Sequence, residues 1–84
     1  MFYVYAIYNQ ENNKIYIGQT NNLKRRILEH NSKDFNRSYW TSKFSGKWKL
    51  IYCKELSSRK EVILIEKQLK SHKGRRFIRG LIKD

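Results

Sequence analysis

The lone cysteine, Cys53, most restricts what this 84-residue chain can fold into. A chain of this length is near the lower limit for folding around a hydrophobic core without cross-links. One cysteine can form neither an internal disulfide framework nor a multi-cysteine zinc site. We therefore expect one domain, residues 1–84, with a core of aliphatic and aromatic side chains. A chain without disulfides also fits a cytoplasmic location, where thiols stay reduced.

The charge of the chain is strongly one-sided. Nineteen Lys and Arg against seven Asp and Glu give a net charge of +12 and a pI near 10.1. Such a surface attracts polyanions, and nucleic acid is the default partner. An anionic membrane surface is the weaker alternative, because the basic C-terminal segment lacks a broad Trp, Phe and Leu face. No apolar run approaches the length of a membrane helix, and no obligate protein partner is evident.

The pattern of apolar residues predicts a small α+β domain. Ser58 and Glu61 form a capping-box sequence, and Asn21 or Asn22 suits a helix N-cap. Gly74 is expected to break the long helix that follows Ser58. The expected elements are hairpin strands at 2–8 and 15–18, a helix at 23–31, an irregular helix around 39–44, a strand at 48–54, and helices at 59–71 and 77–82. The order β-β-α-β-α-α implies a three-stranded antiparallel sheet flanked by helices.

Three polar side chains stand where a purely structural protein has little need of them, and two tyrosines of the hairpin can join them. Arg26 and His30 are four residues apart on one helix face, beside an apolar stripe. Glu66 projects toward the core side of its helix, where an unpaired carboxylate is costly. Tyr5 and Tyr16 come from paired strands and can share one face. Together they suit a phosphodiester site: metal on the carboxylate, arginine on the phosphate, phenol or imidazole activating water.

Each of these residues also has a structural explanation. Tyrosines in strands more often pack than react, and Arg26 in a basic helix is usually solvated or a simple phosphate contact. His30 near a helix C-terminus is more often a cap than a base. Glu66 can pair with Lys70, four residues on. Only the joint spacing of the five favours catalysis.

That spacing resembles the GIY-YIG endonuclease superfamily. The tripeptide Tyr-Val-Tyr at residues 3–5 is followed by Tyr-Ile-Gly at residues 16–18, so that Tyr16 comes eleven positions after Tyr5. Arg26 stands where the family has its helix arginine, His30 where many members carry a histidine, and Glu66 at the family's metal-binding glutamate. The resemblance covers essentially the whole chain and implies a small, stand-alone, single-domain nuclease.

The resemblance also implies roles for these residues. One Mg²⁺ or Mn²⁺ ion would bind Glu66, with waters and the scissile phosphate as its other ligands. Tyr5 would be the leading candidate to activate the attacking water, supported by His30. Arg26 would offset charge on the phosphoryl oxygens, and Tyr16 would position the water or the phosphate.

The sequence departs from the family pattern at two points. Tyr3 occupies the position of the first glycine, which looks tolerable because the catalytic phenol is the third residue of the tripeptide. No asparagine follows Glu66, although many members have one. Either that role is dispensable here or another group, such as Lys70, replaces it.

A further set of basic and aromatic residues is expected to hold nucleic acid. Tyr39 and Trp40 could stack on an unpaired base, which favours single-stranded or branched DNA, or could equally close the core. The set is Arg25, Arg37, Tyr39, Trp40, Lys43, Lys67, Lys70, Lys73, Arg75 and Arg76. The resulting hypothesis is an endonuclease of limited sequence specificity. An inactive nucleic-acid-binding module and an RNA-associated protein of translation stay open, as do DNA against RNA and a role in DNA repair, mobile elements or defence.

Overall fold

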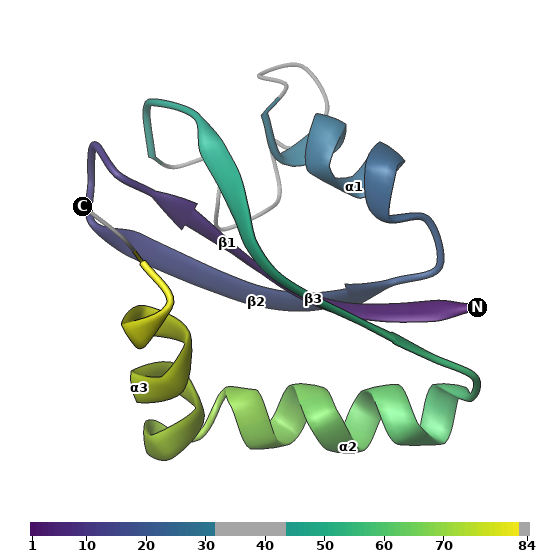
Figure 1. Ribbon diagram of the computed structural model, residues 1–84. Coiled ribbons are helices and arrows are strands. Elements are labelled where there is room, and N and C mark those ends of the chain that lie inside the picture. The colour runs from purple at the N-terminus through teal and green to yellow at the C-terminus, as the bar shows by residue number, and fades with distance from the viewer. Residues whose placement is uncertain (32–43, 83–84) are drawn as a thin grey trace.

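The computed structural model describes residues 1–31 and 44–82 as an antiparallel sheet with helices on both faces. The elements are β1 (Phe2–Asn9), β2 (Lys14–Thr20), α1 (Leu23–His30), β3 (Trp48–Leu56), α2 (Arg59–Leu69) and α3 (His72–Gly80). Figure 1 shows α1 on one side of the sheet and α2 and α3 on the other. The predicted α+β class and the order β-β-α-β-α-α are confirmed.

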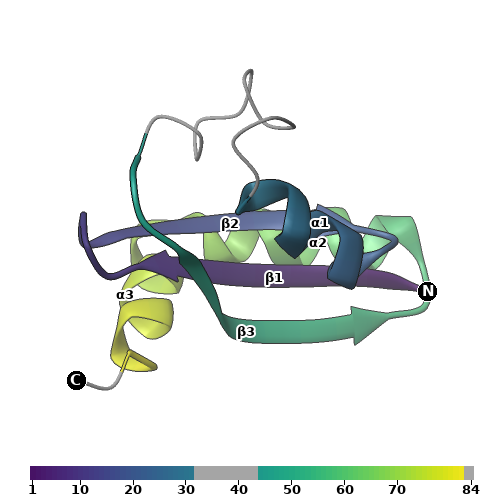
Figure 2. The same ribbon diagram turned by 90° about the horizontal axis from the view of Figure 1, so that it is seen from above.

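The strand order is β2-β1-β3, so β1 is the central strand and β2 is an edge strand (Figure 2). Both pairings are antiparallel, and the hairpin register sets Tyr5 opposite Gly18 and Ile7 opposite Tyr16. Asn13 takes a positive φ of 52° in the hairpin turn, a conformation that asparagine adopts more readily than most residues. The expected hairpin is confirmed. Its second strand is longer than expected because β2 pairs with β1 through the backbone from Lys14 to Thr20.

Alternation along β1 gives the sheet two hydrophobic cores. Val4 and Ala6 pack with Val62 and Leu69 of α2 and with Ile78 of α3. Their neighbours Tyr5 and Ile7 point to the other face, where Trp48, Leu23 and Ile27 complete a second cluster around α1. These four β1 residues are at most 1% exposed, which explains why this strand reads as an almost continuous apolar run. Burying Val4 or Ile7 contributes about 1.5–3 kcal/mol each.

The junction of α2 and α3 differs from the prediction. Ser58 caps α2 as expected, accepting a hydrogen bond from the backbone N–H of Glu61 at 3.2 Å. The helix ends at Leu69, however, and Gly74 lies inside the first turn of α3, where its N–H donates to Ser71. A Cβ on Gly74 would overlap the backbone carbonyl of Gln68. The glycine therefore allows α3 to pack closely on the last turn of α2, and it does not break a helix.

Candidate active site

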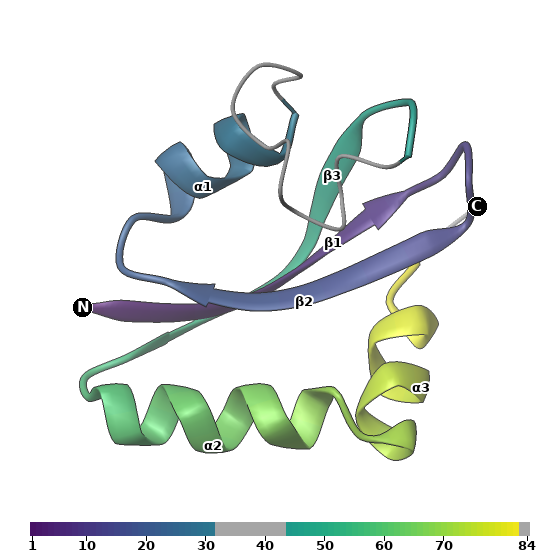
Figure 3. The ribbon, with the colours of Figure 1, turned by 180° about the vertical axis from the view of Figure 1, so that it is seen from behind.

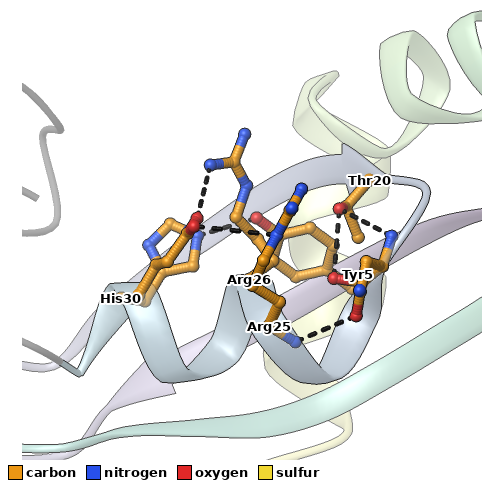
Figure 4. Close-up of polar contacts among 7 residues, drawn as sticks. Tyr5, Thr20, Arg25, Arg26 and His30 are labelled. Atoms are coloured by element: carbon orange, nitrogen blue, oxygen red, sulfur yellow. Dashed lines mark hydrogen bonds and ion pairs between the residues drawn. The ribbon is translucent and has the colours of Figure 1, made fainter. Parts of the chain in front are cut away.

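Tyr5 and His30 form a buried hydrogen-bonded pair between the sheet and α1. The hydroxyl of Tyr5 lies 2.7 Å from Nε2 of His30, and the two residues are 1% and 5% exposed. Tyr16, from the neighbouring strand β2, packs against both rings in tilted orientations, with centroids 6.3 Å from Tyr5 and 4.9 Å from His30. Two phenols and one imidazole thus make one aromatic cluster. Figure 4 shows Tyr5 lying under α1, which supplies His30 and the two arginines.

Gly18 makes room for this cluster. It pairs directly with Tyr5 across the hairpin. A Cβ at this position would come within 2.9 Å of both the Tyr5 hydroxyl and Cε2 of Tyr16. The third residue of the second tripeptide is therefore needed as glycine so that both tyrosine rings fit over β2 and Tyr5 reaches His30.

The surroundings of His30 keep its ring neutral at pH 7. Burial, and next the positive charge of Arg26, lower the pKa of His30 to about 4, although Glu29 acts in the opposite direction. A neutral imidazole keeps one nitrogen as an acceptor, so its Nε2 can accept the hydrogen bond that the Tyr5 hydroxyl donates. The buried Tyr5–His30 pair is thus joined by a hydrogen bond between two uncharged groups.

Asn31 fixes the end of α1 that carries His30. Its Nδ2 donates to the Trp48 carbonyl at 3.0 Å, and its Oδ1 accepts from the Trp48 N–H at 2.7 Å. Both hydrogen bonds tie α1 to the start of β3, seventeen residues further along the chain. Sequence reasoning missed this residue. The available signal was an asparagine directly after a helix, a position from which it can satisfy backbone groups.

Arg26 lies at the rim of the site, beside the cluster. Its guanidinium Nη1 binds Oε1 of Glu29 at 3.0 Å, while Arg25 approaches the other oxygen of Glu29 at 3.7 Å. A pocket of about 660 Å³ opens there, lined by these three residues, by Arg59 from α2 and by Gln19 from β2. Three arginines and one acid give this pocket an excess of positive charge. It suits a phosphate group.

Glu66 reaches the site from the opposite face of the sheet. Its Oε1 accepts a hydrogen bond from Nε2 of Gln19 at 3.0 Å, and its Oε2 lies 3.4 Å from the Lys70 ammonium. The expected pairing with Lys70 is therefore present, and Gln19 is an additional partner that the sequence did not suggest. Lys70, the candidate for the role of the missing asparagine, thus forms an ion pair with the Glu66 carboxylate.

The five proposed catalytic residues do not share one face. Tyr5, Tyr16, His30 and Arg26 are on the α1 side, whereas Glu66 comes from α2, below the sheet. Figure 3 shows α1 and α2 on opposite faces of the sheet, of which β2 is an edge strand. The expected single concave surface is thus replaced by a site that extends around a sheet edge.

A second pocket lies at the β2 edge, toward α2 and α3. It measures about 240 Å³ and is lined by Tyr16 together with Lys70 of α2 and Arg75 of α3. Tyr16 therefore borders the same space as two basic residues from the α2 and α3 side of the sheet. Along β2, this pocket lies beside residues 15–17 and the arginine pocket beside residues 19–21.

The residues expected to bind nucleic acid fall into three groups. Arg25, Lys70 and Arg75 line the two pockets at the β2 edge. A second group is exposed on α2 and α3 without lining either pocket: Lys67, Lys73 and Arg76. The third group lies outside the described residues, as does most of the irregular helix expected around residues 39–44: Arg37, Tyr39, Trp40 and Lys43.

Tyr3, which stands in place of the family's first glycine, does not disturb the cluster. Its hydroxyl donates to Oε2 of Glu55 on β3 at 3.3 Å, near the surface. Tyr3 thus uses its hydroxyl on β3, and the hydrogen bond of Tyr5 to His30 is intact. The substitution at this position is compatible with the geometry of the site.

The chemistry of Glu66 fits magnesium better than zinc. Within residues 1–31 and 44–82, no cluster of three or more His, Cys, Asp or Glu side chains could hold a metal ion. Zinc sites use three or four protein ligands, whereas Mg²⁺ retains several waters and often binds one carboxylate plus substrate phosphates. A single carboxylate beside two basic pockets is a suitable partner for such an ion.

The paired tyrosines, the arginine pocket and a second basic pocket lie at one margin of the sheet, an arrangement that suits contact with a phosphate backbone. The family model described as "GIY-YIG catalytic domain" matches residues 1–79, and the chain belongs to this family. Its substrate class is accordingly nucleic acid. Searches among curated proteins and among solved structures each found no match. In the described part of the chain, no helix has both the length and the apolar character needed to cross a membrane.

Proposed function

We propose that this protein is a divalent-metal-dependent endonuclease that hydrolyses phosphodiester bonds of DNA with limited sequence specificity. The proposal rests on one observation: residues from both faces of the sheet line pockets at the edge formed by β2. Tyr16 shares a pocket with Lys70 and Arg75, and Gln19 joins Glu66 to the pocket of Arg26. Phosphate-binding cations, a phenol and a carboxylate are thereby available to one stretch of phosphate backbone.

In this proposal Glu66 holds Mg²⁺ or Mn²⁺. The ion, when bound, supplies a Lewis acid and acidifies its bound water. Arg26 offsets the negative charge that develops on the phosphoryl oxygens. Its bond to Glu29 keeps the guanidinium in place, and the planar guanidinium group is suited to bidentate contact with phosphate.

The roles of the two tyrosines can be separated by their burial. Tyr16 is partly exposed and lines a pocket, so it can contact the phosphate or the attacking water directly. Tyr5, the proposed activator of water, has its hydroxyl buried against His30, and water must reach it beneath α1. A comparison of Tyr5→Phe with Tyr16→Phe decides between them. The variant with the larger loss of cleavage rate at saturating metal identifies the phenol that acts on water.

The decisive experiment uses end-labelled single-stranded, double-stranded and branched DNA, with an RNA strand for comparison, with and without Mg²⁺ or Mn²⁺. Glu66→Gln removes the charge of the proposed metal ligand and keeps its shape. Glu55→Gln, an exposed carboxylate of β3, is the matched control. We expect metal-dependent cleavage by the wild type and by Glu55→Gln, and a loss on the order of 100-fold or more in Glu66→Gln.

The same assay tests the alternative function, a catalytically inactive nucleic-acid-binding module. That module would show salt-sensitive binding without cutting under either metal. Cleavage that persists undiminished in Glu66→Gln would instead remove Glu66 from the mechanism.

The finer parts of the proposal have separate support. A preference for single-stranded or branched substrates rests on Tyr39 and Trp40, whose aromatic rings suit base stacking. A cytoplasmic location is supported by Cys53, an exposed free thiol of the kind that a reducing compartment preserves. A role in DNA repair follows if branched DNA is the best substrate in the assay above.

A further inference from the structure

Gln19 occupies an unusual place on β2. Ile15 and Ile17, on the same face of the strand, are buried in the core against α2 and α3. Gln19 is the next residue in this alternation, and it pairs with Val4 of β1. An amide that continues a buried apolar row needs a hydrogen-bonding partner, since desolvating it alone is unfavourable.

The partner of Gln19 is the carboxylate of Glu66, forty-seven residues away in sequence. The two oxygens of this carboxylate are used differently. Oε1 accepts from the neutral amide of Gln19 at 3.0 Å, and Oε2 lies 3.4 Å from the ammonium of Lys70. The Lys70 side chain is 47% exposed, against 17% for Glu66. An exposed ion pair between residues i and i+4 is weak, so Lys70 can leave Oε2 readily.

We propose that Gln19 is a positioning residue that orients Glu66 for the divalent ion. The amide fixes the rotamer through Oε1 and, being neutral, leaves the negative charge of the carboxylate intact. Oε2 is then presented to the ion once Lys70 moves aside. This inference rests on the proposed nuclease function, and it adds a residue that also lines the pocket of Arg26.

The size of the effect follows from comparable arrangements. Groups that hydrogen-bond to metal ligands and orient them typically change metal affinity or activity by 10–100-fold when they are removed. Gln19→Met keeps the length and volume of the side chain and removes its N–H donors. Gln10→Met, an exposed glutamine near the hairpin turn, is the matched control.

The first readout is Mn²⁺ binding to the protein without DNA, followed by the paramagnetic resonance signal of free Mn²⁺. We expect a 10–100-fold weaker Mn²⁺ affinity in Gln19→Met and no change in Gln10→Met. The Mg²⁺ concentration for half-maximal cleavage should rise by the same factor. A purely structural contact between β2 and α2 would lower the melting temperature and leave metal affinity unchanged, which would overturn the proposal.

Lys70→Met gives a second test that does not depend on the fold of Gln19→Met. If Lys70 competes with the ion for Oε2, removing its ammonium strengthens Mn²⁺ binding. Unchanged or weaker Mn²⁺ binding would show that Lys70 and the ion do not compete for Oε2 of Glu66. Failure of the wild type to cleave any nucleic acid refutes the proposed function itself, whereas cleavage that needs Glu66 but is indifferent to Gln19 refutes only this inference.

Discussion

The buried His30 should make the stability of this protein fall steeply between pH 7 and pH 5. In the unfolded chain a histidine titrates near pH 6.5, whereas burial and Arg26 lower the pKa of His30 to about 4 in the folded state. The folded state therefore binds fewer protons across this range. The contribution is fully present above pH 6.5 and is lost as the pH falls toward 4.

The magnitude follows from the two pKa values. At pH 5 the unfolded histidine is about 1.5 units below its pKa while the folded one is still mostly neutral, which corresponds to roughly 2 kcal/mol. For a domain of this size that loss lowers the melting temperature by roughly 8–16 °C. The loss approaches roughly 3 kcal/mol when the pH reaches 4.

Urea unfolding at pH 7 and pH 5, followed by circular dichroism, measures this change. His30→Gln should be less stable at pH 7 but should lose most of the pH dependence. His72→Gln removes the other histidine, which is exposed at the start of α3, and should keep the wild-type dependence. An equal slope in the wild type and in His30→Gln would refute the reasoning.

Three further substitutions test packing and phosphate binding. Gly18→Ala places a methyl group against the ring of Tyr5, so we expect about 1–3 kcal/mol of destabilisation by thermal melting and a weaker contact to His30. Gly74→Ala meets backbone instead of a movable side chain, and its melting temperature should fall at least as far. Arg59→Ala should reduce the salt dependence of DNA binding by about one unit in the log–log slope. Lys60→Ala, at the exposed neighbouring residue, should change this slope less because Lys60 lines neither pocket at the β2 edge. Equal slopes for these two variants would remove Arg59 from the phosphate pocket.

Local patterns in the sequence were sufficient for most of the fold. The run of aromatic and β-branched residues at 2–8 and the capping box at Ser58 and Glu61 are signals carried by short segments, and the strand and the cap are both confirmed. Gly74 was misinterpreted because a sequence shows the conformational freedom of glycine but not the backbone that passes close to it. That backbone is the last turn of α2, and it comes close to Gly74 only because of the angle between α2 and α3.

The site was harder to predict for a physical reason. Helical periodicity places His30 and Arg26 on one face of α1, but it does not say which face of the sheet a later helix will cover. The chain crosses to the opposite face before α2, so Glu66 approaches from below. The hydrogen bond from Gln19 to Glu66 joins residues that no local pattern connects.

The order of the elements along the chain has a consequence for how the domain is assembled during synthesis. The hairpin and α1, with the tyrosines and His30, lie within the first 31 residues and require only short loops to close. Glu66 joins them only after the last third of the chain has emerged and packed beneath the sheet. A growing chain thus presents its phenols and the arginines of α1 well before Glu66, and the proposed site is complete only once α2 and α3 have formed.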